Sequence, residues 1–333
     1  MIRVLLTRAF FDDDLAYLWA GLRPDVELVT PPAFTPEALL AAVGDVDALL
    51  GDTLTRSLLE RGARLRLIQV PWTGVDRLDF ALLRDFPVTV CNSHSNAVPV
   101  AEMAVSLMLA IAKKVPLHDA RLRQGNWMRP TRGEPESHVP PTLVSGCTAG
   151  FLGFGAIARQ IAQLLSGFNM RFIATDARAG EAPPAPLAAV YPPGGLLEVA
   201  TASDLLFVTL PLTPATRGLV NADVFAAMKP GAYLINTSRG EVVDEAALYA
   251  ALSARRIAGA AIDTWYQYPK SGEPRTLPSA RFPFHELDNL VLSPHRAGFA
   301  DGMLPHLQDV ITNLNRLAAG EPLINQVDVH AGF

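Results

Sequence analysis

The sequence predicts an α/β protein with two doubly wound parallel sheets. Short β-branched and apolar runs alternate with helical patterns over the first ninety residues, and a second alternating series begins near residue 148. Such alternation is typical of parallel strands covered by helices on both faces. A length of 333 residues fits about two domains of ordinary size. Because 50% of the residues are hydrophobic, both domains can fill a core, and a disordered chain is excluded.

The first series supplies five strands and four helices. The expected strands are Ile2–Leu6, Val26–Val29, Ala48–Leu50, Leu67–Val70 and Val88–Cys91, and the expected helices are Asp12–Leu22, Pro36–Val43, Arg56–Arg61 and Leu78–Arg84. One long helix, about Val100–Arg123, then leaves this unit. A stretch containing proline and glycine, Gly125–Pro141, separates the two series.

The second series is long enough for a six-stranded nucleotide-binding fold. Its expected strands are Thr148–Leu152, Arg171–Thr175, Leu205–Thr209, Tyr233–Asn236, Ala258–Ile262 and Leu290–Leu292, and its expected helices are Ala156–Leu165, Ala222–Met228 and Glu245–Arg255. A last helix, about Leu304–Ala319, precedes an expected strand at Leu323–Val327. The segment Gly180–Gly195 is expected to be a loop inside the second domain, because the strand series continues beyond it.

Charge and cysteine content exclude several classes of function. The chain has 28 basic and 33 acidic residues and no dense basic block, so nucleic acid is not expected as a partner. Cys91 and Cys147 are too few for a disulfide framework or a zinc site and are expected to be small core residues. His285 and Glu286 lack the spacing of metal ligands, and no metal is expected.

Neither the N-terminal segment nor the most apolar helix indicates a membrane protein. Met1–Thr7 is expected to form a strand and lacks the layout of a signal peptide. The most apolar helix, Met103–Ala112, has about half the length needed to cross a bilayer. We therefore expect a cytoplasmic protein without a membrane partner.

The strongest local signal is the turn after the strand Thr148–Leu152. There Gly153, Gly155 and Ala158 form a G-x-G-x-x-A pattern between a strand and a helix, where backbone amides approach a pyrophosphate at the helix N-terminus. Asp176 ends the next strand 18 residues beyond Ala158, where a carboxylate accepts a hydrogen bond from the ribose 2′-hydroxyl. The same carboxylate repels a 2′-phosphate, so NAD is expected rather than NADP, although Arg178 is near enough in sequence to accommodate that phosphate.

Together with this turn, segments along nearly the whole chain match one family. They are Thr73–Asp76, Asn96–Glu102, Gly125–Trp127, Gly146–Gly150, Leu210–Thr213, Thr216–Gly218, Asn236–Gly240, Ala261–Asp263 and Ser293–His295. In this order the chain resembles the D-isomer-specific 2-hydroxyacid dehydrogenases, which include formate and phosphoglycerate dehydrogenases. The resemblance implies a Rossmann NAD-binding domain, residues 99–298, inserted into a flavodoxin-like substrate domain, residues 1–98 and 299–333. It also implies a dimerisation arm at about 117–142 and a homodimer.

The implied activity is hydride transfer between NAD(H) and a small 2-hydroxy or 2-oxo acid. Arg239 follows a strand at the carboxyl edge of the sheet, and its planar fork suits a carboxylate and the reacting oxygen; the resemblance assigns it that role. His295 ends a strand in a Ser-Pro-His setting, and a group titrating near neutrality takes up the hydroxyl proton and returns it. The cofactor performs the hydride chemistry itself.

The third catalytic position departs from the family. Most members carry a glutamate beside the histidine, directly before a proline. An ungapped alignment places Tyr268 there, before Pro269, as in the formate dehydrogenase subgroup, which carries glutamine at that position; a five-residue insertion places Glu273 there instead, before Pro274. We favour Tyr268 and keep Glu273 as the alternative. A tyrosine can hold His295 by a hydrogen bond but supplies no negative charge to imidazolium.

The resemblance also implies the remaining binding residues. Those for the cofactor are Gly153, Gly155, Ala156, Ile157, Asp176, Thr209, Pro211, Thr216, Thr237, Ser238, Asp263 and Ala297. Those for the substrate are Trp72, Thr73, Gly74, Asn96 and Val98, with Trp72 either narrowing the pocket or stacking on an apolar substrate. Two other functions stay open: an NAD(H)-sensing protein with little turnover, and a formate- or phosphite-type dehydrogenase.

Overall fold

The computed structural model describes residues 1–127, 140–176, 183–270, 273, 275–301 and 304–333. The chain divides into two compact units, one formed by Met1–Asn96 with Gly298–Phe333 and the other by Ala97–Ala297. We call them the outer unit and the inserted unit. The sequence analysis placed the two boundaries between these units after residues 98 and 298. These are two residues and one residue later, respectively, than the boundaries in the structure.

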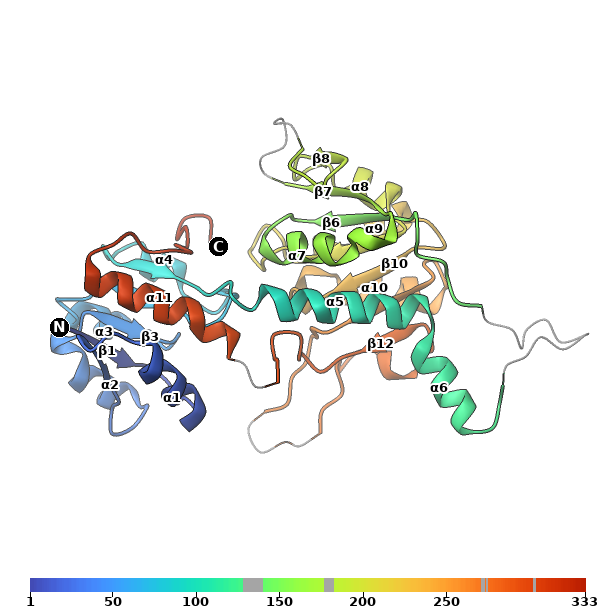
Figure 1. The fold of residues 1–333 in the computed structure, drawn as a ribbon. Helices are drawn as coiled ribbons and strands as arrows, with labels where there is room; N and C mark the ends of the chain where they lie inside the picture. Colours follow the sequence, from blue (N-terminus) through green and yellow to red (C-terminus); the bar gives the residue numbers. More distant parts are fainter. Residues whose placement is uncertain (128–139, 177–182, 271–272, 274, 302–303) are drawn as a thin grey trace, which may run out of the picture. The chain divides into compact units, whose positions relative to one another are not determined.

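The outer unit is built on a five-stranded sheet in the order β2-β1-β3-β4-β5 (Figure 1). Its strands, all parallel, are β1 (Ile2–Leu6), β2 (Val26–Val29), β3 (Ala48–Leu50), β4 (Leu67–Gln69) and β5 (Thr89–Cys91). Its helices are α1 (Asp12–Gly21), α2 (Pro36–Ala42), α3 (Arg56–Arg61), α4 (Phe80–Leu83) and α11 (Pro305–Ala319). The strand order is the flavodoxin-like one expected.

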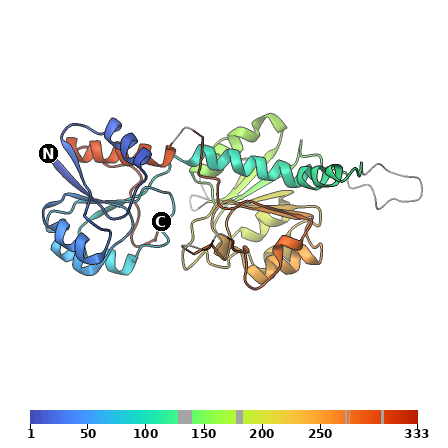
Figure 2. The same ribbon diagram turned by 90° about the horizontal axis from the view of Figure 1, so that it is seen from below.

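Both faces of this sheet are buried, which explains its nearly uninterrupted apolar strands. One core cluster joins the strands to α2, α3 and α4, through Leu39, Leu58 and Leu83 among others. The second joins them to α1 and α11, where Leu18 packs with Leu314. Figure 2 shows these two helix layers on opposite sides of the sheet. The C-terminal helix α11 thus completes a fold that the first ninety-six residues begin.

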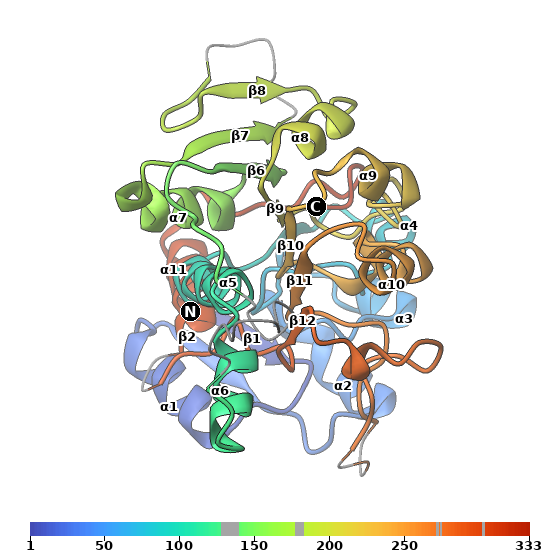
Figure 3. The same cartoon turned by 90° about the vertical axis from the view of Figure 1, so that its right-hand side faces the viewer.

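The inserted unit has a seven-stranded parallel sheet in the order β12-β11-β10-β9-β6-β7-β8. Its strands are β6 (Thr148–Leu152), β7 (Arg171–Thr175), β8 (Ala189–Tyr191), β9 (Leu205–Val208), β10 (Tyr233–Asn236), β11 (Gly259–Ile262) and β12 (Leu290–Leu292). Its helices are α5 (Ala97–Ala112), α6 (Val115–Arg123), α7 (Ala156–Leu164), α8 (Leu196–Ala202), α9 (Ala222–Ala227) and α10 (Glu245–Ser253). Figure 3 shows α5 and α7 on one face and α8, α9 and α10 on the other, each over its own buried cluster.

The order of strands reverses between β6 and β9. From β6 the chain builds outward through β7 and β8, and it then returns to place β9 on the other side of β6. The loops after β6 and β9 therefore diverge, and ligands of doubly wound sheets bind in the crevice that such loops leave at the carboxyl ends of the strands. Both expected parallel-sheet domains are confirmed.

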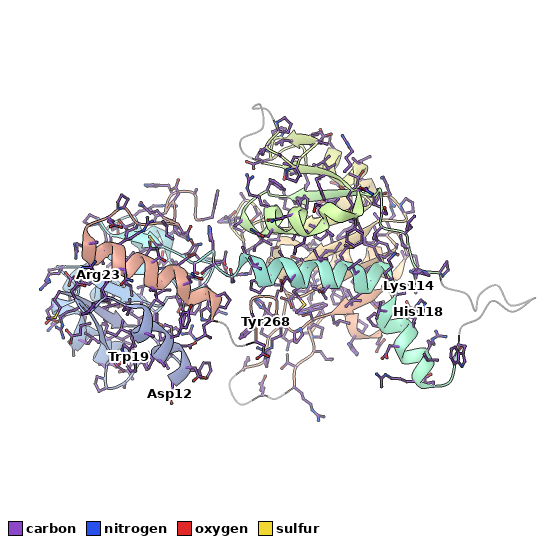
Figure 4. The ribbon with its side chains drawn as sticks, viewed as in Figure 1. Asp12, Trp19, Arg23, Lys114, His118 and Tyr268 are labelled. Carbon is purple, nitrogen blue, oxygen red and sulfur yellow. The ribbon has the colours of Figure 1, made fainter. Side chains whose placement is uncertain are left out.

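The expected single helix over residues 100–123 is wrong. It is two helices, α5 and α6, because Pro116 lacks an N–H and its ring excludes the carbonyl of Ala112 from the helical ladder. Lys114, labelled in Figure 4, takes the left-handed conformation at φ 56°. The Ala112 carbonyl instead accepts a hydrogen bond from the Thr142 amide at 2.8 Å.

Three smaller expectations also fail. The described part of the segment Gly180–Gly195 contains the edge strand β8 and is followed by the unexpected helix α8, so the sheet has seven strands instead of six. Leu323–Val327 contributes only one antiparallel bridge, between Gln326 and Cys91, since Asn325 turns the backbone at φ 53°. Cys91 is buried as expected, but Cys147 is partly exposed ahead of β6.

Candidate functional site

The turn after β6 can be built only with glycine at its first position. Gly153 has φ +86°, and a Cβ there would lie 3.0 Å from the Leu210 side chain. The Thr209 hydroxyl donates to the carbonyl of Gly153 at 2.8 Å and to that of Leu152 at 3.1 Å. The loop after β9 therefore fixes the loop after β6, at the point where the strand order reverses.

The N-terminus of α7 faces open space. Gly155 is its N-cap, and a Cβ built on Gly155 would meet no atom within 4 Å. The first amides of a helix have no intrahelical acceptor and, with the helix dipole, attract anions. Ala156 and Ile157 supply the first of these amides, so the turn fits the pyrophosphate of a dinucleotide.

Asp176 stands at the matching position of the neighbouring strand. Asp176 directly follows β7, whose last residue, Thr175, pairs with Leu152 of β6. The Asp176 amide donates to the Tyr191 carbonyl at 2.9 Å. The Thr175 hydroxyl accepts from the Gly153 amide at 3.0 Å. Asp176 thus follows the strand next to the glycine turn, where the ribose is expected, while Arg178 is outside the described residues.

The loop after β9 is closed on itself by a second threonine. The Thr216 hydroxyl donates to the Pro211 carbonyl at 2.6 Å and accepts from the Thr213 amide at 2.8 Å. These bonds hold Pro211 and Thr216 in one compact turn next to Thr209. Their expected contacts with the cofactor stay a prediction.

A buried asparagine shapes the loop that carries Arg239. Asn236 ends β10 with 1% of its surface exposed, and its side chain accepts from the Ser238 amide (3.0 Å) and donates to the Arg239 carbonyl (2.9 Å). Thr237 and Ser238, two expected cofactor contacts, lie inside this turn. Side-chain bonds of this kind replace a backbone ladder and fix the direction of the chain.

Gly240 brings this loop against the next one. A Cβ at Gly240 would lie 2.5 Å from the Trp265 carbonyl oxygen and 2.6 Å from its carbon, and backbone cannot move aside cheaply. Trp265 is buried, and its indole N–H donates to the Ser293 carbonyl at 2.8 Å. The loops after β10, β11 and β12 are therefore packed as one block that carries Arg239, Tyr268 and His295.

The loop of His295 is anchored by one buried carboxylate. Asp263, which follows β11, is fully buried and accepts hydrogen bonds from the Ser293 hydroxyl, the Arg296 amide (2.9 Å) and the Ala297 amide (3.1 Å). His295 between these donors has φ 56°, a conformation uncommon for residues other than glycine. Asp263 thus supports the strained turn that presents the imidazole, and its expected contact with nicotinamide stays a prediction.

Tyr268 lies against His295. Their ring centroids are 5.5 Å apart at 50°, and the Tyr268 hydroxyl accepts from the Trp265 amide at 3.0 Å. Burial raises the pKa of Tyr268, while the positive charge of Arg239 acts to lower it. Tyr268 therefore lies against the imidazole ring of His295, and Figure 4 marks Tyr268 within the inserted unit.

Glu273, the alternative partner, makes a local contact. Its carboxylate accepts from the Lys270 amide at 3.5 Å, and its own amide donates to the Lys270 carbonyl at 2.9 Å. Both residues are exposed. Pro274 lies outside the described residues.

In the outer unit, two carbonyls of the Trp72–Gly74 loop are tied to the segment after β5. The Trp72 carbonyl accepts from the Ser93 amide at 3.2 Å, and the Thr73 carbonyl accepts from the Asn92 side chain at 2.7 Å. In a trans peptide the next N–H points opposite to the carbonyl, so the amides of Thr73 and Gly74 point away from that segment. Two adjacent amides so directed can receive a carboxylate.

The last two expected substrate residues begin the segment that links the units. Asn96 accepts from the Thr73 hydroxyl at 2.6 Å, which ties it to the same loop. Val98 is 49% exposed in the first turn of α5.

Within the described ranges, no three His, Cys, Asp or Glu residues form a group able to hold a metal ion. In the same ranges, no helix combines the length and apolar character of a membrane span.

Comparison with known proteins agrees with this geometry. The family model described as D-isomer specific 2-hydroxyacid dehydrogenase, NAD binding domain, matches residues 105–297, more than half of the chain. The chain belongs to this family. It carries the family's NAD-binding domain, and NAD is the cofactor that its glycine turn and Asp176 fit.

Relatives match along most of the chain. It is 34% identical over 300 residues to glyoxylate reductase of Pyrococcus furiosus, covering 88% of this chain and 85% of that protein. It is 31% identical to D-3-phosphoglycerate dehydrogenase of Mycobacterium tuberculosis, over 94% of this chain. That relative is longer, and this chain spans 57% of its length. The chain likewise spans a little over half the length of the other phosphoglycerate dehydrogenases that it matches.

A solved structure shows the same fold over the whole length. The D-isomer specific 2-hydroxyacid dehydrogenase of Xanthobacter autotrophicus Py2, in complex with NADPH and MES, superposes with a TM-score of 0.78. The two sequences are 26% identical, and the match covers 100% of this chain and 99% of that chain.

The sequence did not single out several residues that hold the site. Asn236, Trp265 and Ser293 each bond to a loop that carries an expected catalytic residue. Asn92 does the same for the Thr73 loop. Asn236 and Ser293 belong to the matched Asn-Thr-Ser-Arg-Gly and Ser-Pro-His segments, which was the available signal; Asn92 has no motif around it.

Proposed function

We propose that this chain catalyses NAD(H)-dependent interconversion of a small D-2-hydroxy acid and its 2-oxo acid. The observation that carries the proposal is the block formed by the loops after β10, β11 and β12, in which Gly240, next to Arg239, packs on Trp265, Trp265 bonds to the loop of His295, and Tyr268 lies against the imidazole. An anion-binding group and a proton-transfer group are thereby held at the carboxyl edge of the sheet that binds the dinucleotide.

Each group has a defined part in the reaction. Held at the Ala156 and Ile157 amides and Asp176, a bound nicotinamide dinucleotide would supply the hydride acceptor for oxidation at C2 and the hydride donor for reduction. Arg239 binds the substrate carboxylate and the oxygen on C2, which orients the acid and stabilises developing negative charge. His295 accepts the hydroxyl proton during oxidation and donates it to the carbonyl oxygen during reduction. In the outer unit, the Thr73 and Gly74 amides, whose peptide planes are oriented by Ser93 and Asn92, are the expected anion-binding groups of that unit.

Tyr268 is proposed as the partner of His295 in place of the family's glutamate. Its raised pKa keeps the phenol neutral, so it orients the imidazole by contact and adds no negative charge.

We further propose that Asp176 selects NAD over NADP, although the relative from Xanthobacter autotrophicus binds NADPH. Measuring KM for NADH and NADPH side by side tests this selection, and a lower KM for NADPH contradicts it.

The assay that tests the function is NADH oxidation against a panel of 2-oxo acids, alongside NADH binding followed by its fluorescence. Turnover of at least one acid, with loss of turnover in Arg239→Ala, supports the dehydrogenase. NADH binding without turnover of any acid supports the sensing protein instead. NAD reduction by formate or phosphite, without turnover of any 2-hydroxy acid, supports the third activity.

We also propose a cytoplasmic homodimer that uses the arm expected at residues 117–142. In its described part, none of the nine residues of α6 is buried, and Val115 is 55% exposed. Light scattering of the purified chain should give twice the monomer mass of 35.8 kDa. A monomer at micromolar concentration contradicts the dimer, and cell fractionation tests the location.

A further inference from the structure

The peptide bond between Ser293 and Pro294 offers only one group by which the protein can hold it. Proline lacks an N–H, so the plane of this bond carries a single hydrogen-bonding group, the Ser293 carbonyl. His295 is the next residue, and its φ of 56° is one that residues other than glycine seldom adopt. The direction of the Ser293 carbonyl therefore sets how the chain enters the strained turn that presents the imidazole.

The indole of Trp265 donates to this carbonyl. Its Nε1 lies 2.8 Å from the Ser293 oxygen, and only 5% of the Trp265 surface is exposed. Losing a hydrogen bond between buried groups is costly, because the carbonyl is left without its donor. Trp265 therefore fixes the peptide plane on the N-terminal side of the turn, while Asp263 binds the Arg296 amide on its C-terminal side.

The backbone of Trp265 holds the ring that lies against His295. Its amide donates to the Tyr268 hydroxyl oxygen at 3.0 Å, and the Tyr268 and His295 ring centroids are 5.5 Å apart. One buried residue thus holds the imidazole loop through its side chain and the phenol through its backbone.

We propose that Trp265 is a positioning residue for the proton transfer assigned to His295 and acts through the Ser293 carbonyl. This inference rests on the proposed function, since it adds a residue to the same site. An indole N–H is a donor without an acceptor on the same ring, and the ring is rigid, so the direction of the bond is well defined. A general base must stay within hydrogen-bond reach of the proton that it moves, so a looser turn lowers the fraction of productive arrangements.

The alternative is that Trp265 only fills the core. Its ring packs near Phe284, with centroids 5.9 Å apart, and the Tyr266 ring lies 6.1 Å from the same phenyl group. Tyr266 also donates a side-chain hydrogen bond to a backbone carbonyl, that of Val243, at 3.0 Å. The two residues therefore match in packing and in type of bond, but only the bond of Trp265 leads to the His295 turn.

The test compares Trp265→Phe with the control Tyr266→Phe, using the 2-oxo acid that the wild-type chain reduces best. Trp265→Phe removes the indole N–H and keeps an aromatic ring, so kcat should fall by about tenfold while KM for NADH changes less than about twofold. Tyr266→Phe should leave kcat within about twofold of the wild-type value. An unchanged kcat in Trp265→Phe, or equal losses in the two variants, overturns the proposal.

A second substitution separates the hydrogen bond from the shape of the ring. Trp265→benzothienylalanine keeps nearly the outline of the indole, with sulfur in place of the N–H, so the core stays filled. It should reproduce the loss of kcat seen in Trp265→Phe. A wild-type kcat in this variant shows that the ring acts by packing alone and overturns the proposal. Urea unfolding of each variant confirms that it is folded.

Failure of the proposed function gives a different result. If the wild-type chain reduces none of the acids, the contact between the Tyr268 and His295 rings replaces the kinetic measurement. The nuclear Overhauser effect reports this contact in protein labelled at histidine and tyrosine, and the His295 signals are assigned by their loss in His295→Gln. Loss of the contact in Trp265→Phe, but not in Tyr266→Phe, supports the positioning role without turnover. Retention of the contact in Trp265→Phe, or its loss in both variants, overturns that role.

Discussion

The two sheets of this protein have the same architecture but equip their carboxyl edges differently. In the inserted unit the strand ends carry Asp176, Arg239, Asp263 and His295, side chains with charge or a titratable proton. In the outer unit the edge next to β4 offers the peptide amides of Thr73 and Gly74, oriented by bonds to their neighbouring carbonyls.

The difference separates binding from chemistry. Peptide amides bind an anion equally well before and during the reaction, so they contribute uniform binding that appears in KM. In the proposed reaction the guanidinium and the imidazole would interact with charge and a proton that move, so changes in them should act on kcat. Changes in the two units should therefore affect different kinetic constants.

The largest effect is expected for Arg239→Ala. It removes the group that orients the acid and stabilises its developing charge, so the barrier should rise by at least about 2.7–4 kcal/mol, or about 100- to 1,000-fold in kcat/KM. NADH binding, measured by fluorescence, should be retained. Arg255→Ala is the control, because Arg255 forms an exposed ion pair with Asp288 in the same unit. A loss below tenfold in Arg239→Ala contradicts the assigned role.

Asp263→Ala should reduce stability more than other acidic substitutions in the inserted unit. It leaves the Ser293 hydroxyl and the amides of Arg296 and Ala297 without their acceptor, at a cost of roughly 3 kcal/mol in the free energy of unfolding. Urea denaturation measures the loss. Asp244→Ala, which removes a single N-cap bond from α10, should cost about 1 kcal/mol. Equal losses in the two variants show that Asp263 does not anchor the His295 loop.

Asn92→Ala tests the outer unit. Without the bond from its side chain, the Thr73 carbonyl is freer to rotate, and the two amides lose their common direction. We expect KM for the 2-oxo acid to rise about fivefold, equivalent to about 1 kcal/mol, with a smaller change in kcat. Asn315→Ala, on the same unit, removes two exposed bonds and should leave both constants unchanged. A drop confined to kcat would remove the distinction between the two edges.

The smallest effect concerns the pH–rate profile. Tyr268→Phe should change that profile more than Glu273→Gln, because Tyr268 contacts His295 while Glu273 closes a turn with Lys270. The raised pKa of Tyr268 keeps it uncharged across the neutral range, so it supplies no charge that stabilises imidazolium. In Tyr268→Glu the carboxylate favours imidazolium, and the acid limb of oxidation should move up by about one pH unit. The reverse order of Tyr268→Phe and Glu273→Gln supports the gapped alignment.

The alternation of strands and helices and the glycine turn were recoverable from sequence, while the catalytic roles of Arg239 and His295 stay predictions. Parallel strands buried on both faces leave long apolar runs, and a turn with φ +86° requires glycine, so both features are local and leave a pattern. The seventh strand β8 was missed because its three residues are only half-buried and follow a proline-rich segment.

The sequence by itself determined the two parallel sheets and the dinucleotide-binding turn. It also indicated the guanidinium of Arg239 and the imidazole of His295, each following a strand. Only the tertiary structure decided which groups meet. The alignment favoured Tyr268 but left Glu273 open, and it is the packing of Gly240 against Trp265 that aligns the block in which Tyr268 touches His295. Likewise, Arg8 and Trp72 are brought together by strand order, which sets neighbours across 64 residues of chain that local patterns do not relate.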